Sequence, residues 1–258
     1  MRLQWDLAGS RYFETGLDRG VFYPKSGIGV PWNGLLSIKE TDDNDSQTVL
    51  YIDGQKKVNQ VDLGTFSASI EAYTYPDEML PYDGFAQPAF SGQFRPPFNL
   101  SYRSLLGSDV EGTARGYLLH LVYNGYLKPA SKDHASLNGD VDAETFNWDL
   151  STTPAYVPGA RPTSHIFVDS TKAYTSTMLA LENLLYGTET TPSHFPSILE
   201  VLALFEATAI FKVTDNGDGT ATISGPDEAV HMVTSDTAEL TWPTVIQISE
   251  DTFQLSSL

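Results

Sequence analysis

The sequence predicts a mainly β protein with two helical segments. Twenty glycines and 15 prolines are scattered along the 258 residues, so turns recur throughout the chain. Short runs rich in β-branched and aromatic residues lie between these turns, which is typical of strands. Helical periodicity is confined to residues 175–186 and 197–205, so most of the chain is expected to form sheet.

Six segments in the first two thirds of the chain are expected to be strands. In residues 66–73, apolar side chains alternate with polar ones, so one face of this strand should be buried and the other solvated. Residues 118–122 are more continuously apolar, as in a central strand. The six candidates are residues 35–40, 48–53, 65–75, 116–123, 143–148 and 165–169.

Two long connections are interpreted as interaction loops. Residues 41–47 are polar and acidic, and they are expected to form an extended hairpin loop between two strands. Residues 76–97 contain five prolines, and proline cannot donate to a β ladder. Loops of that length in a compact domain usually serve an interaction. Four aromatic side chains are expected to pack this second loop: Tyr82, Phe85, Phe90 and Phe94.

The helical segments follow these strands. In residues 175–186, Met178, Leu181, Leu184 and Leu185 are expected to fall on one stripe, and Gly187 stands where a C-terminal cap belongs. The second segment, residues 197–205, begins directly after a proline.

The chain is expected to divide near residue 206. Residues 1–206 form the main β domain with its two helices. Residues 207–258 return to short strands around a strong hairpin turn at residues 215–219. With eight acidic residues and one basic residue, this region is either part of the same domain or a small separate β module.

Composition limits the classes of function. Asp and Glu total 33 and Lys and Arg total 15, a net charge of −18, which argues against sequence-specific nucleic-acid binding because phosphate is repelled. The absence of cysteine excludes a disulfide scaffold, a thiol nucleophile and an iron–sulfur cluster. No apolar stretch approaches the roughly 20 residues of a membrane span. A soluble product, made in the cytoplasm, is expected.

Motifs for chemistry are lacking. No two of the five histidines lie within five residues of each other, so no HxH or HExxH metal spacing exists. His120 lies inside an apolar strand and is expected to be a core or interface histidine. The acidic runs at residues 42–45 and 215–218 do not match a calcium-binding EF-hand loop. The sequence predicts no catalytic, cofactor-binding or metal-ligating residue, and we expect that the protein is not an enzyme.

Five motifs in order resemble the major tail proteins of long-tailed phages of actinobacteria. The resemblance extends from near residue 5 to the C-terminus. It is carried by residues 11–24 (RYFETGLDRGVFYP) with 29–35 (GVPWNGL), 71–78 (EAYTYPDE), 98–103 (FNLSYR), 120–124 (HLVYN) and 147–154 (NWDLSTTP).

The resemblance implies a tail tube protein. Such proteins fold as a β-sandwich or partial barrel with a flanking helix. They assemble into hexameric rings, and stacked rings form the conduit through which DNA leaves the capsid. The implied location is the virion tail, and the implied partners are further copies of the chain, the tape measure protein, the tail terminator and the distal tail protein. DNA passes through without specific binding, and no membrane and no cofactor are involved.

Two alternatives stay open at the level of sequence. The chain is either this self-assembling subunit or a monomeric β-sandwich that binds a ligand such as a carbohydrate through exposed aromatics. Candidates for that second role are Tyr82, Trp32 and Trp148.

Seven residues are expected to matter for assembly. Arginine forms bidentate pairs with carboxylates, and the chain has carboxylates in excess. The candidates for contacts between subunits are Arg11, Arg19, Arg103, Asp42, Asp43 and Asp45. Glu71 lies on the solvated face of its strand and is expected to face the channel or a subunit contact. The alternative for the arginines is that all three brace loops within their own subunit.

Overall fold

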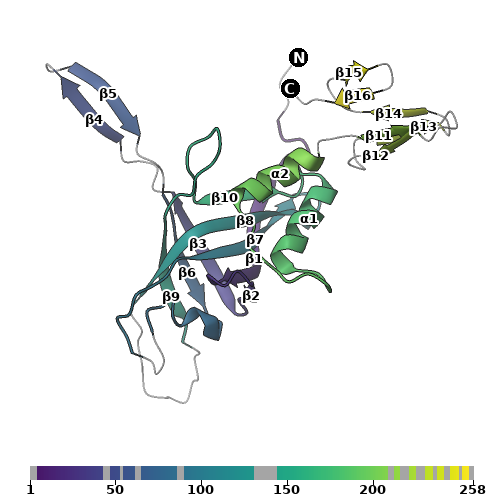
Figure 1. The fold of residues 1–258 in the computed structure, drawn as a ribbon. Helices are drawn as coiled ribbons and strands as arrows, with labels where there is room; N and C mark the ends of the chain where they lie inside the picture. Colours follow the sequence, from purple (N-terminus) through teal and green to yellow (C-terminus); the bar gives the residue numbers. More distant parts are fainter. Residues whose placement is uncertain are drawn as a thin grey trace.

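The computed structural model is mainly β, with 45% strand and 14% helix, which confirms the predicted class (Figure 1). It describes residues 5–42, 47–52, 55–61, 65–85, 90–130, 144–208, 212–215, 221–224, 230–234, 237–240, 245–249 and 252–255. For residues 42–64 and 206–258, the description covers backbone only.

The central feature is an antiparallel sheet of eight strands. Along its main path the order is β2-β1-β7-β8-β9-β6-β3, and β10 pairs with β8 beside that path. The strands are β1 (Tyr12–Tyr23), β2 (Val30–Pro31), β3 (Leu35–Asp42), β6 (Phe66–Ala72), β7 (Phe98–Ser108), β8 (Gly112–Pro129), β9 (Phe146–Thr152) and β10 (His165–Asp169).

The sheet divides at β8, its longest strand. Residues 118–122 of β8 pair with β10, whereas residues 125–129 pair with β9. One branch therefore consists of β2, β1, β7, β8 and β10, and the other continues through β9 and β6 to β3. The second branch curls back so that β3 contacts β1.

The two faces of the first branch support two separate cores. Phe22 and Val122 point into the space enclosed by the curled sheet, where they meet Trp148 and its neighbours. Val21 and Leu121, next to them in sequence, point to the opposite face and lie under the helices. Because both faces are covered, residues 118–122 are apolar throughout except for His120, as expected for a central strand.

Both helices cover the second core. Helix α1 (Thr175–Tyr186) has the predicted bounds, and Met178, Leu181 and Leu185 are buried. Gly187 caps it at φ +78°, with its amide donating to the Asn183 carbonyl. Such a positive φ favours glycine.

Helix α2 (Ile198–Thr208) follows a capping box that the sequence analysis missed. The Ser197 amide donates to Glu200 Oε2 at 2.7 Å, and the Glu200 amide donates to Ser197 Oγ at 3.3 Å. These two bonds satisfy amides at the start of the helix, which have no carbonyl partner within it.

The interpretation of residues 41–47 as a hairpin loop is wrong. The flanking strands do not pair with each other: β3 pairs with β6, whereas β4 (Gln47–Ile52) pairs with β5 (Gln55–Val61). In Figure 1 the β4–β5 ribbon stands clear of the main sheet. In the β3–β6 ladder, Ile38 stands opposite Ile70 and Leu35 opposite Ala72, so this register places the apolar residues of β3 on the buried face of β6.

The aromatic loop at residues 76–97 is only partly as expected. Its start forms a short 3₁₀ helix, η1 (Asp77–Met79), which directs Met79 and Tyr82 into the first core. The Tyr82 hydroxyl also accepts from the Lys25 amide at 2.6 Å. Phe85 is half-buried. The expectation that Phe90 and Phe94 pack the loop is wrong, because they are 61% and 83% exposed.

The C-terminal region contains strands, as predicted. Three two-stranded ribbons follow α2: β11 (Lys212–Asp215) with β12 (Ala221–Ser224), β13 (Val230–Thr234) with β14 (Thr237–Leu240), and β15 (Val245–Ser249) with β16 (Thr252–Leu255). The pairing of β11 with β12 confirms the predicted hairpin at residues 215–219. The division near residue 206 stays a prediction.

Candidate functional site

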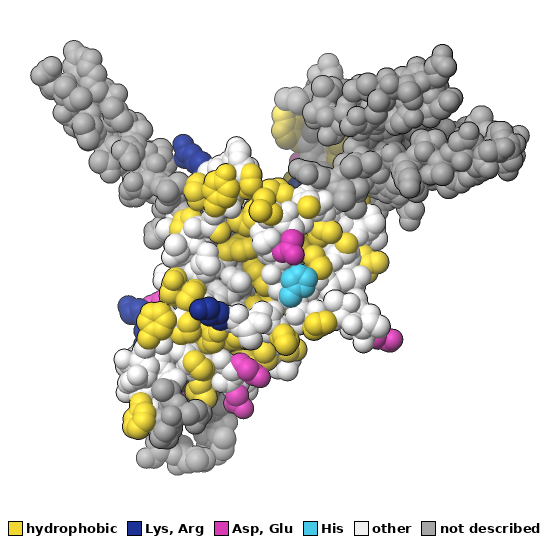
Figure 2. Space-filling model, viewed as in Figure 1, with side chains coloured by type: hydrophobic (Ala, Val, Ile, Leu, Met, Phe, Trp, Pro, Cys, Tyr) yellow, Lys and Arg dark blue, Asp and Glu magenta, His cyan; other side chains and the backbone are white. Residues whose placement is uncertain are grey.

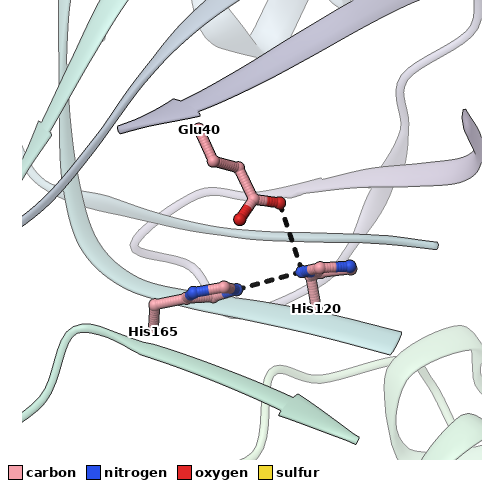
Figure 3. A group of neighbouring side chains, drawn as sticks. All are labelled: Glu40, His120 and His165. Carbon is pink, nitrogen blue, oxygen red and sulfur yellow. Dashed lines mark hydrogen bonds and ion pairs between the residues drawn. The ribbon is translucent and has the colours of Figure 1, made fainter. Parts of the chain in front are cut away.

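A cluster of polar side chains lies on the side of β8 and its neighbours that faces the first core. In the ladders, His120 stands opposite Tyr102 of β7 and Phe167 of β10, and Val122 stands opposite His165. His165 is therefore the diagonal neighbour of His120 on one face of the sheet. Glu40 reaches the same point from β3, on the other branch (Figure 3).

Short contacts connect these side chains. His120 Nδ1 lies 3.0 Å from His165 Nε2 and 3.4 Å from Glu40 Oε1. The Tyr102 hydroxyl donates to Glu40 Oε1 at 2.6 Å. On the other side of its ring, His120 Nε2 lies 3.0 Å from Ser104 Oγ. The rings of Tyr102 and His120 stack with centroids 4.5 Å apart.

Burial controls the charge of this cluster. The pKa of His120 is lowered, mainly because burial penalises the charged ring, and the nearby carboxylates of Glu40 and Glu14 offset only part of that effect. Burial also raises the pKa of Tyr102, and Glu40 adds to the rise. Near neutral pH, His120 is therefore a neutral imidazole and Tyr102 a neutral phenol.

We expect the buried His120 to make the subunit less stable in mild acid. Its pKa in the folded chain lies below the value of 6.5 in the unfolded chain. As the pH falls through 6.5, the unfolded state therefore binds the proton first and stability decreases. His120→Gln should lose less stability between pH 7.5 and 5.5 than wild type, as measured by urea denaturation. Equal losses would contradict the prediction.

A second cluster, on the helix-facing side, contains two of the three candidate arginines. Arg103 forms a bidentate pair with Asp18, with Nε–Oδ1 at 2.8 Å and Nη2–Oδ2 at 2.6 Å. Its Nη1 lies 3.3 Å from Glu182 of α1, and its guanidinium covers the Tyr117 ring at 4.3 Å. Arg19 lies 3.8 Å from the same Glu182. The hydrogen bond with Asp18 is the main reason why the pKa of Arg103 is raised.

The remaining assembly candidates are placed as follows. Arg11 pairs with Asp6 on the surface, so each of the three arginines has an acidic partner in its own chain. This is the arrangement that the bracing alternative expects. Contacts of Arg11, Arg19 and Arg103 with another subunit stay predictions. Asp42 is the last residue of β3. Asp43 and Asp45 lie outside the described residues.

A third feature is an uncovered polar face on the β3–β6–β9 branch. Phe66, Ala68, Ile70 and Ala72 of β6 are buried, whereas Glu71 and the residues that alternate with it face solvent, which confirms the predicted alternation. In the ladders, polar residues of β3 and β9 stand opposite these polar residues of β6. This polar face consists of Ser37, Lys39, Thr41, Ser67, Ser69, Glu71, Asn147, Asp149 and Ser151, all exposed or half-exposed.

The three aromatic side chains that the sequence suggests for carbohydrate binding are buried. Tyr82, Trp32 and Trp148 are 7%, 3% and 1% exposed, so the expectation that they form an exposed binding platform is wrong. Their large apolar rings fill the first core instead, where Trp32 and Trp148 meet edge to face.

Comparisons with known proteins give no further identification. No protein-family model matches the chain, and no curated protein matches it. Among the described residues, neither helix has the length and apolar character needed to cross a membrane. Functional inference therefore depends on the sequence motifs and on the surfaces described above.

Proposed function

We propose that this protein is the structural subunit of a phage tail tube, and that it assembles into stacked, hexameric rings. The proposal combines the five sequence motifs with one structural observation: the polar face of β3, β6 and β9 is open, although the other side of the same strands is packed into a core. A sheet with one solvated face is suited to lining a water-filled conduit.

The chemistry of the polar face supports a role in DNA passage. Most of its side chains are short hydroxyls, and its charged members are Lys39, Glu71 and Asp149, a net charge of −1. Binding of DNA to proteins depends largely on clustered lysine and arginine at the phosphates. A conduit lined by this face would offer DNA few sites at which to stick, and Glu71 would then face the channel.

The edge of β3 supports self-association. Within the described residues, β3 ends the path of the sheet and pairs only with β6. An exposed edge is a template for pairing with another chain. Pairing between neighbouring copies would join the sheets of a ring into one closed barrel, in which every such edge is covered.

The apolar surface supports further contacts between copies. Figure 2 shows hydrophobic side chains gathered over the described part of the visible face, with few charged side chains among them. A groove of about 290 Å³ lies between β10 and α2, where Phe167 and Leu202 are 61% and 39% exposed. Extended apolar surface usually marks an interaction site. The resemblance further implies the tape measure protein, the tail terminator and the distal tail protein as partners, and the virion tail as the location.

Deleting residues 42–46 is expected to prevent tube formation while the main sheet still folds. Asp42 is the last residue of β3, and residues 43–46 connect it in sequence to β4; among the described residues, β4 and β5 pair only with each other. The deletion therefore removes the end of β3 and this connection, and it leaves every strand of the main sheet in place. Size-exclusion chromatography and circular dichroism report folding, and electron microscopy reports tubes. A normal yield of tubes would refute this role.

Replacing Ser69 with arginine is expected to make assembled tubes retain DNA. Ser69 is exposed on the polar face, so the substitution should change monomer stability by less than about 0.5 kcal/mol while adding one cation per subunit to the proposed lining. Purified wild-type and Ser69→Arg tubes are incubated with duplex DNA at low salt, and bound DNA is measured. Thr190→Arg, at an exposed loop position, is the matched control. Equal retention by both variants would place Ser69 outside the channel.

A further inference from the structure

We infer that Glu40, His120 and His165 form a binding site for one transition-metal ion of the zinc class. This inference is independent of the proposed tail tube function. The three side chains come from β3, β8 and β10, and their potential ligand atoms all lie within 4.8 Å of one another. Two imidazole nitrogens and one carboxylate oxygen are a ligand set found in zinc sites.

Two of the three ligand spacings are close to those of a tetrahedral site. Zinc binds imidazole nitrogen and carboxylate oxygen at roughly 2.0–2.2 Å, so the ligand atoms of a tetrahedral ion stand about 3.3–3.5 Å apart. His120 Nδ1 is 3.4 Å from Glu40 Oε1 and 3.0 Å from His165 Nε2. The third pair, Glu40 and His165, has ligand atoms within 4.8 Å, so side-chain rotations of Glu40 and His165 would bring all three ligands to one ion.

Neighbouring side chains orient the ligands. His120 Nε2 lies 3.0 Å from Ser104 Oγ. With the proton on Nε2, the ring donates to this hydroxyl, and the Nδ1 lone pair is directed at Glu40 and His165. The Tyr102 hydroxyl, donating at 2.6 Å, fixes the carboxylate of Glu40. Partners of this kind are regular features of metal sites, because they hold each ligand in its binding orientation.

The electrostatic surroundings favour a cation. Both charged groups that act on His120 are acidic, Glu40 and Glu14, and His120 Nε2 lies 3.9 Å from Glu14 Oε1. The imidazoles favour zinc over calcium and magnesium, which prefer sets of oxygen ligands.

The ion would connect the two branches of the sheet. Glu40 belongs to the branch that ends at β3, whereas His120 and His165 belong to β8 and β10. A bound ion would cross-link the two branches through β3, the strand that precedes the β4–β5 ribbon in the chain. Because the ion binds the folded chain, it should raise the melting temperature.

The test uses the full-length protein after chelator treatment and dialysis. Zinc chloride is titrated by calorimetry, and melting temperature is measured with and without zinc. We expect one zinc ion per chain and a zinc-dependent rise in melting temperature. Glu40→Gln and His165→Gln should each weaken zinc binding by at least about 10-fold and remove most of that rise. His194→Gln is the control, because His194 lies near Glu200 at the start of α2.

Folding and binding are separated by measuring each variant without metal. Glu40→Gln retains an oxygen that can accept from Tyr102, so it should keep the metal-free melting temperature close to that of wild type. Cobalt(II) provides an independent measurement, because a tetrahedral site produces strong visible absorption in wild type and not in the variants. The inference is overturned if wild type gives no zinc-dependent heat, or if both variants bind zinc as tightly as wild type.

Discussion

Replacing Trp148 with alanine is expected to destabilise the subunit by about 3–5 kcal/mol. Trp148 is 1% exposed at the centre of the first core, and its ring meets those of Trp32 and Tyr75 edge to face at 5.7 and 5.6 Å. Its indole nitrogen donates to Asp83 Oδ1 at 3.0 Å. Truncation would leave a cavity in the core and remove a buried hydrogen bond, and both effects reduce the stability of the folded state.

The measurement is urea denaturation of the monomeric subunit. Trp148→Phe retains most of the apolar ring and loses the hydrogen bond to Asp83, so its loss of stability should be clearly smaller. Trp5→Ala is the control, because Trp5 is 76% exposed and its removal should cost less than about 0.5 kcal/mol. Equal stabilities of Trp148→Ala and Trp5→Ala would contradict the described core.

Replacing Arg103 with methionine is expected to cost about 3 kcal/mol, the second largest effect. Methionine keeps an unbranched apolar chain and removes the charge, so the change tests the ion pairs more than the packing. Without the guanidinium, Asp18 loses a bidentate partner and Glu182 loses its nearest cation. The expected cost is at the lower end of the range for breaking a buried pair, because Asp18 is 38% exposed.

The melting temperature of the isolated subunit distinguishes a role of Arg103 within its own subunit from a role in contacts between subunits. We expect Arg103→Met to lower the melting temperature of the isolated subunit by roughly 6–12 °C, at about 2–4 °C per kcal/mol. Arg11→Ala should change it little, because both partners of the Arg11–Asp6 pair are exposed. An unchanged melting temperature together with lost assembly would instead indicate that Arg103 acts between subunits.

Regular local patterns are predictable from this sequence, and interrupted ones are not. Strand β6 and helix α1 were predicted closely because alternation, periodicity and the Gly187 cap all agree. Strand β1 was missed. Its pairing with β7 shifts register twice, near Gly16 and Arg19, which both adopt positive φ. Each shift breaks the period of two on which strand prediction depends.

The histidine cluster shows a different limit of sequence analysis. His120 was predicted to be a core histidine and is buried, but nothing in its local sequence points to His165, which is 45 residues away. The register of β8 with β10 brings His120 and His165 together, and the folding of β3 toward β8 adds Glu40 to the cluster. By contrast, the position of Glu71 on the solvent-facing side of β6 is predictable from the alternation of polar and apolar residues within that one strand.

Negative-stain electron microscopy of the purified protein, supported by light scattering, tests the tail tube proposal most directly. The full-length chain is concentrated at neutral pH and imaged without further partners. We predict six-fold rings or hollow tubes, and a scattering mass that is a multiple of the 28.3 kDa subunit. A uniform population of 28.3 kDa monomers, with no rings or tubes at any concentration, would contradict the proposal and favour a monomeric binding module.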